Sequence, residues 1–354
     1  MRRLPAEWEK QKFVQITWPH QFGDWKNVLE IAEPCFTEIV KQISLCEKAL
    51  VVCFDEDHLK HIQNILKNNG SQLSNINFVI APSNDVWARD HAAITVEDTL
   101  ENTLENKGQQ KKLVKFRFNG WGNKYEHNLD NQIHYQIKDV ELFNEYLHES
   151  SESEELVLEG GSIESDGKGT ILTTESCLLN LNRNSHLNRA KVEEKLEKFL
   201  GAKKTLWLKH GHVEGDDTDS HVDTLARFCN EETIAYVSPL GADKDHVESL
   251  LKMEEELKSF RQDNGQNNEK SYKLFPLPFP EAKYYKNVRL PATYANFLII
   301  NGAVLLPVYK DKRDGEAQEI LQTAFPGREI VPIDCSALII QRGSLHCATM
   351  QYPV

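Results

Sequence analysis

The stretch His221-Val222-Asp223-Thr224-Leu225-Ala226-Arg227-Phe228, followed by Ile234-Ala235-Tyr236-Val237, has a layout that recurs along this sequence. A polar residue opens an apolar run, and a second apolar run usually follows it. Five such copies open at residues 90, 159, 221, 294 and 347, which lie 69, 62, 73 and 53 positions apart. The turn sequences Asp166-Gly167 and Asn301-Gly302 predict that the copies are β-hairpins.

Helix-then-strand patterns lie between the predicted hairpins. Apolar residues with helical spacing precede a short apolar run at three places: 59–66 before 78–80, 187–200 before 206–208, and 317–325 before 330–333. Each unit therefore reads strand, helix, strand, hairpin. Five such units closing on one axis would bring their opening residues to a single central point. No linker divides the chain, so a single domain over residues 1–354 is predicted.

The bulk composition restricts the class of protein. The chain has 354 residues and a formal net charge of −13, which argues against nonspecific nucleic-acid binding. No apolar run approaches the ~18 residues of a membrane span, and the first residues lack the apolar stretch of a secretory signal. Seven scattered cysteines without a CxxC pair favour a reducing cytoplasm. Three polar segments, 99–112, 148–155 and 261–273, are predicted to be solvated loops or helix ends without a chemical role.

Cys347, in the stretch Arg342-Gly343-Ser344-Leu345-His346-Cys347-Ala348-Thr349, is the candidate nucleophile. Glycine and serine before it suit a close approach of backbone and substrate. A charged histidine or a cationic substrate nearby would favour the reactive thiolate. The alternative is a buried cysteine that only packs. His221 and Asp223 are candidate partners, because residues two apart on a strand point the same way.

A metal site competes with this interpretation. Eight possible ligands fall within 14 residues: His210, His212, Glu214, Asp216, Asp217, Asp219, His221 and Asp223. A calcium loop starting at Asp217 would need glycine at its sixth position and glutamate at its twelfth, where the chain has Val222 and Phe228. A zinc or two-metal site has suitable ligand types and stays open on that ground.

Trp87 and three carboxylates at hairpin starts, Asp90, Glu159 and Asp223, indicate a cationic ligand. Carboxylates that face one cavity repel one another unless a cation lies among them, and an indole ring can cover a flat cation. A guanidinium is planar and pairs with carboxylates in a bidentate manner. Held in this way, its central carbon is open to attack by a thiolate while a histidine handles protons. This chemistry needs no metal and no cofactor.

The chain resembles the agmatine deiminases of the guanidine-modifying (pentein) superfamily over essentially its whole length. Seven ordered motifs carry the resemblance: Arg3-Leu4-Pro5-Ala6-Glu7-Trp8-Glu9, 84–90, Phe118-Asn119-Gly120-Trp121-Gly122-Asn123-Lys124-Tyr125, Leu158-Glu159-Gly160-Gly161, 217–228, Tyr294-Ala295-Asn296-Phe297 and His346-Cys347-Ala348-Thr349. The resemblance implies an α/β fold, a five-bladed propeller of ββαβ-type pseudo-repeats around the active site. The bacterial peptidylarginine deiminases are similar at a greater distance.

By this resemblance, Cys347 is the nucleophile and His221 the general acid and base. Asp90 and Asp223 would clamp the guanidinium, while Glu159 would contact it and help to move protons.

The resemblance also implies residues that bind the rest of the substrate. Trp87 and Trp121 would line the pocket, and Asp217 would lie near the distal amine. Two positions depart from the family pattern: Asp217 stands where a glutamate is usual, and Arg342 stands where a glycine is common.

The implied reaction is the hydrolysis of agmatine to N-carbamoylputrescine and ammonia, in putrescine synthesis, through a thiouronium on Cys347. The expected partner is a small cationic guanidine, without metal, cofactor, nucleic acid or membrane, and the chain is compatible with a homodimer. Two alternatives share the fold: an amidinotransferase, which passes the intermediate to an amine, and a peptidyl-arginine deiminase, which needs an open groove. A propeller used only as a binding module would have no reason to keep Cys347, His221 and three carboxylates at the hairpin starts, and a metallohydrolase is disfavoured to a similar degree.

Overall fold

The computed structural model describes residues 1–99, 109–150, 156–262 and 270–354. Its strands form five sheets of three or four strands and one separate hairpin. In each of the five sheets an antiparallel pair is extended by a parallel strand. Four of the five predicted hairpins are therefore confirmed, whereas the fifth antiparallel pair joins β19 (Thr349–Pro353) to β2 (Gln11–Thr17) from the other end of the chain.

Four of these sheets follow one another along the chain, and the fifth joins its two ends. The four are β5 (Ile94–Thr99), β6 (Gln109–Lys115) and β7 (Leu147–Ser150), with β1 (Arg2–Arg3) on the edge; β8 (Ile163–Ser165), β9 (Thr170–Thr174) and β10 (Lys204–Leu208); β11 (Ala226–Asn230), β12 (Thr233–Val237) and β13 (Lys273–Leu277); and β16 (Leu298–Ile300), β17 (Ala303–Val308) and β18 (Glu329–Asp334). The fifth is β19 (Thr349–Pro353), β2 (Gln11–Thr17), β3 (Lys48–Cys53) and β4 (Ile76–Ile80). The separate hairpin is β14 (Lys283–Tyr285) with β15 (Val288–Leu290).

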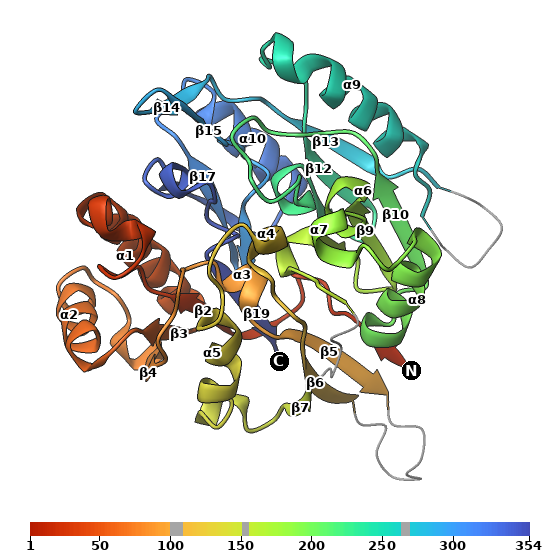
Figure 1. Ribbon diagram of the computed structural model, residues 1–354. Coiled ribbons are helices and arrows are strands. Elements are labelled where there is room, and N and C mark those ends of the chain that lie inside the picture. Colours follow the sequence, from red (N-terminus) through yellow and green to blue (C-terminus); the bar gives the residue numbers. More distant parts are fainter. Residues whose placement is uncertain (100–108, 151–155, 263–269) are drawn as a thin grey trace.

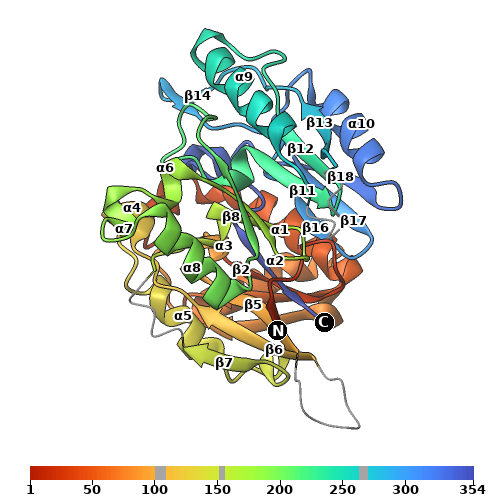
Figure 2. The same ribbon diagram turned by 90° about the vertical axis from the view of Figure 1, so that its right-hand side faces the viewer.

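Helices connect the parallel strands and lie on the outside of the molecule (Figure 1). They are α1 (Leu29–Cys46), α2 (Glu56–Lys67), α5 (Asp130–Ile137), α8 (Arg189–Leu200), α9 (Lys244–Ser259) and α10 (Asp314–Ala324). The short turns α3 (Ala88–His91) and α4 (Gly120–Asn123) lie near the centre of the same view, and α6 (Glu175–Leu178) and α7 (Leu181–Asn184) lie close by. Figure 2 shows α9 and α10 at one end of the molecule and α5 with β7 at the other.

Helix α8 illustrates how the sequence sets these elements. The side chain of Asn188 accepts a hydrogen bond from the Lys191 N–H at its start, and Gly201 ends it in the left-handed conformation with φ of 72°. Its buried residues, Val192, Leu196, Phe199 and Leu200, recur every three or four positions. The helical pattern predicted at 187–200 is confirmed, as are those at 59–66 and 317–325.

Both faces of the fifth sheet are buried. Alternate residues of β3 enter two different apolar cores: Val51 and Cys53 pack into one, Leu50 and Val52 into the other. This is why the strand reads as a continuous apolar run without the alternation of a half-exposed strand. None of the described helices is long and apolar enough to cross a bilayer.

Two of the predicted loops are partly strand. The segment 99–112 was expected to be a solvated loop, yet β6 begins at Gln109 and pairs with β5. Its polar residues suit a strand because Lys112 Nζ lies 2.9 Å from Asp98 Oδ2 across the pair. Likewise β7 takes up the start of the segment 148–155. Residues 100–108, 151–155 and 263–269 of the predicted loops lie outside the described residues.

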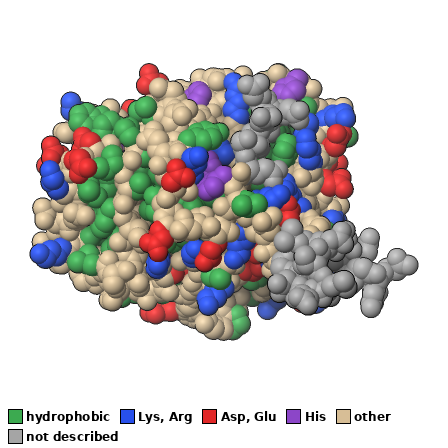
Figure 3. All heavy atoms as spheres, turned by 90° about the horizontal axis from the view of Figure 1, so that it is seen from below, with side chains coloured by type: hydrophobic (Ala, Val, Ile, Leu, Met, Phe, Trp, Pro, Cys, Tyr) green, Lys and Arg blue, Asp and Glu red, His purple; other side chains and the backbone are tan. Residues whose placement is uncertain are grey.

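Charged side chains of both signs are interspersed on the face seen from below Figure 1, with apolar side chains between them (Figure 3).

Candidate active site

The predicted site residues lie in short turns directly before the hairpins. Asp90 belongs to α3, which precedes β5, and Glu159 precedes the 3-10 turn Gly160–Ser162 that leads into β8. His221 precedes the turn Val222–Thr224, which contains Asp223 and leads into β11. The expectation that His221 and Asp223 lie on a strand is therefore wrong, because the chain bends there before the strand begins.

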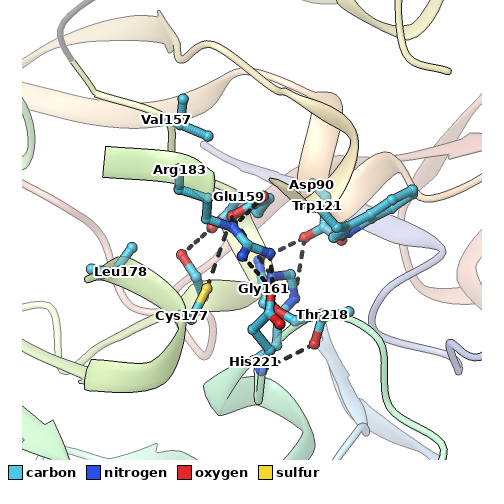
Figure 4. Close-up of polar contacts among 12 residues, drawn as sticks. Asp90, Trp121, Val157, Glu159, Gly161, Cys177, Leu178, Arg183, Thr218 and His221 are labelled. Atoms are coloured by element: carbon cyan, nitrogen blue, oxygen red, sulfur yellow. Dashed lines mark hydrogen bonds and ion pairs between the residues drawn. The ribbon is translucent and has the colours of Figure 1, made fainter. Parts of the chain in front are cut away.

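Gly161 shows how closely three of these side chains converge. A Cβ at this position would lie 2.6 Å from His221 Nδ1, 3.0 Å from Asp90 Oδ1 and 3.1 Å from Asp223 Oδ2. Only glycine leaves room for all three. The structure thus brings Asp90, His221 and Asp223 together around one backbone atom. Figure 4 shows Gly161 between Asp90 and His221.

Asp90 is buried and held by two donors. Trp121 Nε1 donates to Asp90 Oδ2 at 2.9 Å, and the Gly161 N–H donates to Asp90 Oδ1 at 3.0 Å. Burial raises the pKa of Asp90, and the nearby His221 opposes that rise. Trp121, which was expected only to line the pocket, also fixes the orientation of this carboxylate.

His221 lies between two carboxylates without a hydrogen bond to either. Its Nδ1 is 3.7 Å from Asp90 Oδ1, and its Nε2 is 3.8 Å from Glu159 Oε2. Neither ring nitrogen has a hydrogen-bond partner among the described residues. Burial works to lower the pKa of His221, but the acidic groups around it, Asp90 first, raise it well above its usual value. The imidazolium is therefore the favoured form.

Arg183, from α7, binds the fully buried Glu159. Its Nε lies 2.9 and 3.0 Å from the two carboxylate oxygens, and its Nη2 donates to the Thr218 carbonyl at 2.9 Å (Figure 4). Burial would raise the pKa of Glu159, but His221 and Arg183 bring it below its usual value. Glu159 is thus an anion held by a guanidinium that no sequence motif had indicated.

Cys347 is buried beside Asp223. Its Sγ lies 3.7 Å from Asp223 Oδ2 and 3.4 Å from Asn296 Oδ1. Burial, followed by the charges of Asp223 and Asp90, raises the pKa of Cys347 well above its usual value. In the empty pocket the thiol is therefore neutral, and a cation is needed to favour the thiolate.

In the fourth copy of the repeat, the residue that reaches the site is Asn296, and the expectation for Tyr294 is wrong. Tyr294 was taken as the opening residue of that copy, but the Tyr294 hydroxyl donates to Asp314 Oδ1 at 2.7 Å, away from the thiol. The residue that reaches Cys347 is Asn296, two positions further on. The sequence feature that could have identified Asn296 is its polar side chain directly before the apolar run 297–300.

A chain of buried charges lies behind Asp223. His346 Nδ1 is 2.7 Å from Asp223 Oδ2, and His346 Nε2 is 2.7 Å from Glu7 Oε2. Arg227 Nη2 also contacts Glu7, at 2.9 Å, and its Nε binds Glu164. The other oxygen of Asp223, Oδ1, finds no hydrogen-bond partner in the part of the chain that the structure describes. His346 and its partners therefore fix Asp223 with one oxygen left for a ligand.

A narrow pocket leads from this cluster to the surface. Cys347, Asp90, Trp87 and Trp121 line it, and Asp217 and Arg342 are among the further lining residues. The Trp87 ring packs against Gly343, where a Cβ would come within 2.4 Å of the ring. A second pocket is lined by Glu7 and Arg89 but not by Cys347.

The described residues fit a metal ion poorly. Two groups of possible ligands are close enough to share an ion: Glu159 with Cys177 and His221, and Glu7 with Glu164 and His346. In each group an arginine already binds a carboxylate, Arg183 in the first and Arg227 in the second. The histidines near His221 point elsewhere, since His210 Nδ1 pairs with Glu256 at 2.8 Å and the His212 ring stacks on His246.

Comparisons with known proteins show the family of this chain. The sequence model of the Porphyromonas-type peptidyl-arginine deiminase family matches residues 3–353. An agmatine deiminase from Medicago truncatula is 31% identical, over 99% of this chain and 96% of its own.

Two solved structures are similar along the whole chain. A Cys-to-Ser variant of agmatine deiminase from C. jejuni, with substrate bound, is 34% identical with a TM-score of 0.86, over 100% of this chain and 97% of its own. A protein from Porphyromonas gingivalis, provisionally named an arginine deiminase, is 42% identical with a TM-score of 0.87, over 100% and 98%.

Proposed function

This chain belongs to the Porphyromonas-type peptidyl-arginine deiminase family, and on that premise we propose that it hydrolyses agmatine to N-carbamoylputrescine and ammonia in putrescine synthesis. The observation that carries the proposal is the thiol of Cys347 beside the Asp223 carboxylate in an acidic pocket. It is an enzyme that acts on the C–N bond of a linear amidine.

The pocket suits a guanidine with a cationic tail. The free oxygen of Asp223 and the carboxylate of Asp90 receive the guanidinium, because planar donors pair with carboxylates. The tail runs between Trp87 and Trp121 toward the mouth. Among the described residues there, the three carboxylates Asp217, Asp24 and Asp85 outnumber the single guanidinium of Arg342. A carboxylate on the tail would be repelled there. This favours agmatine over arginine and over a peptide.

Substrate binding activates the nucleophile. The incoming guanidinium adds a positive charge beside Cys347, which lowers the raised pKa of the thiol and releases its proton to solvent. The thiolate attacks the central guanidinium carbon and forms a C–S bond. The protonated His221 gives its proton to the departing nitrogen, and ammonia leaves.

Hydrolysis of the thiouronium completes the cycle. His221, now neutral, takes a proton from water, and the resulting hydroxide attacks the same carbon. The C–S bond breaks, the hydroxyl that came from water gives its proton to the departing sulfur, the neutral ureido product leaves and Cys347 returns as a thiol. Glu159 supports both steps, because its charge near His221 favours the imidazolium that each cycle regenerates.

Replacement of Cys347 by serine tests the proposal. The Cys347→Ser variant should bind agmatine in calorimetry yet release no ammonia, and mass spectrometry of acid-quenched wild-type protein should find the adduct on Cys347. Cys46→Ser, an exposed thiol at the end of α1, serves as the matched control and should keep both properties. Substantial ammonia release by Cys347→Ser would remove Cys347 from the nucleophile role.

The rival activities have their own readouts. An amidinotransferase would form a new guanidine when an amine acceptor is added, whereas the deiminase forms only the ureido product. A peptidyl-arginine deiminase would act on a peptide with arginine, and a metal-dependent hydrolase would lose activity to a chelator.

A second proposal concerns the arrangement of the five sheets. We propose that the five sheets are blades of one five-bladed propeller within a single domain, supported by the convergence of Asp90, Gly161 and the His221–Asp223 turn, which come from turns before three different hairpins. A cytoplasmic location and a homodimer stay predictions.

A further inference from the structure

Arg342 occupies an unusual backbone position at the mouth of the pocket. It follows the 3-10 turn Leu338–Gln341 with φ of 70° and ψ of 0°, in the left-handed region that side chains disfavour and glycine adopts easily. The strained conformation aims the side chain across the opening.

The Arg342 guanidinium already binds the far wall of the pocket. Its Nη1 donates to the Gly215 carbonyl at 3.1 Å, and its Nε lies 3.5 Å from Asp217 Oδ2. The same carboxylate oxygen accepts a hydrogen bond from the Tyr125 hydroxyl at 2.6 Å. The negative charge of Asp217 is therefore in part compensated before any substrate arrives.

The other charged groups at the mouth are acidic. Asp24 and Asp85 line the same pocket, and Arg342 is the one basic side chain among the described residues that line it. A cationic tail thus meets favourable charges at Asp24 and Asp85, while at Asp217 it meets a carboxylate that a guanidinium already contacts.

We propose that Arg342 is a specificity-determining residue that competes with the substrate's distal ammonium for Asp217. The inference rests on the proposed function. The tail of agmatine must displace the Arg342 guanidinium before it seats, so Arg342 lowers the preference of the pocket for cation-tailed guanidines over apolar-tailed ones of the same length.

Two ligands of equal length separate this effect from general damage. Agmatine carries the ammonium, and n-pentylguanidine has a methyl group in its place. The measured quantities are kcat/KM for agmatine and the apparent Ki of n-pentylguanidine against it. Arg342→Met keeps the aliphatic stem and removes the charge, Arg342→Lys keeps the charge, and Arg189→Met, on the remote surface of α8, is the control.

Arg342→Met should raise the preference for agmatine over n-pentylguanidine roughly two- to fivefold, the ratio that a half-exposed ion pair supports. Arg342→Lys should change the preference less, and Arg189→Met should not change it. In an Asp217→Asn background the effect of Arg342→Met should disappear, because the contested charge is gone.

Three outcomes would overturn the inference: a preference unchanged in Arg342→Met, an equal loss for both ligands, or a wild-type activity on L-arginine that Arg342→Met abolishes. The last would mean that Arg342 recognises a carboxylate. The proposed function fails separately, if the wild-type protein releases ammonia from no guanidine at all.

Discussion

Replacement of Arg183 by methionine should destabilise the protein more than any other single change at the site. Both side chains of the Arg183–Glu159 pair are fully buried, and the guanidinium also contacts Asp219 Oδ2 at 2.5 Å and the Thr218 carbonyl. Removal of one partner from a buried pair leaves an uncompensated charge, which costs about 3–5 kcal/mol. We expect that loss in the free energy of unfolding of Arg183→Met.

The charge of Glu159 should change as well. Without Arg183, burial acts on the Glu159 carboxyl with less opposition, so the pKa of Glu159 rises. A larger protonated fraction of Glu159 gives less support to the charged form of His221. The alkaline limb of the kcat/KM profile for agmatine should therefore move to lower pH.

Urea unfolding at pH 7 measures the stability loss, with Glu159→Gln and the double variant Glu159→Gln/Arg183→Met beside the wild type. The double variant should lose less stability than Arg183→Met alone, because a neutral amide leaves no stranded charge. A cost below about 1 kcal/mol for Arg183→Met, or equal costs for the single and double variants, would refute the reasoning.

Three further predictions concern the site and its support. Gly161→Ala places a methyl group against His221, and because small displacements of reacting groups are costly, kcat for agmatine should fall roughly 100-fold. Gly315→Ala, with open space around its Cβ, is the control. Equal kcat values for the two variants would contradict the crowding at Gly161. His346→Gln breaks the contact that fixes Asp223, so kcat/KM for agmatine should fall roughly tenfold. The circular dichroism spectrum of the variant should match that of the wild type. An unaltered kcat/KM would mean that His346 does not position Asp223. Burial raises the pKa of Asp130 from 3.8 to about 7, so the folded protein keeps a proton that the unfolded chain releases. This group therefore contributes stability below about pH 4 that is lost as the pH rises through 7, and Asp130→Asn should remove that loss from a series of urea midpoints; identical pH series would speak against the raised pKa.

The sequence was informative where a residue belongs to the repeated unit. Asp90, Glu159 and Asp223 each precede an apolar run that becomes a hairpin strand, so the spacing of 53 to 73 positions between copies of the repeat was enough to group them. Gly160-Gly161 added a second signal, since adjacent glycines permit close approach.

The residues that escaped prediction support the site from outside the repeat. Arg183 comes from a short turn between two strands of one sheet, and nothing in its neighbours marks it. Glu7 and His346 were seen only as motif positions, because their contact joins residues 339 positions apart. Such pairs have no periodic signature, and only the folded chain reveals them.

The pairing of β19 with β2 has a consequence for how the enzyme is made. The two strands are separated by more than 300 residues, yet their ladder carries Cys347 to its place, two residues before β19 begins. Contacts this distant along a polypeptide form late in folding, because closing a long loop has a large entropic cost. On refolding, helicity should return first and catalysis last. A nascent polypeptide would therefore not have the Cys347 thiol positioned for catalysis until β19 pairs with β2.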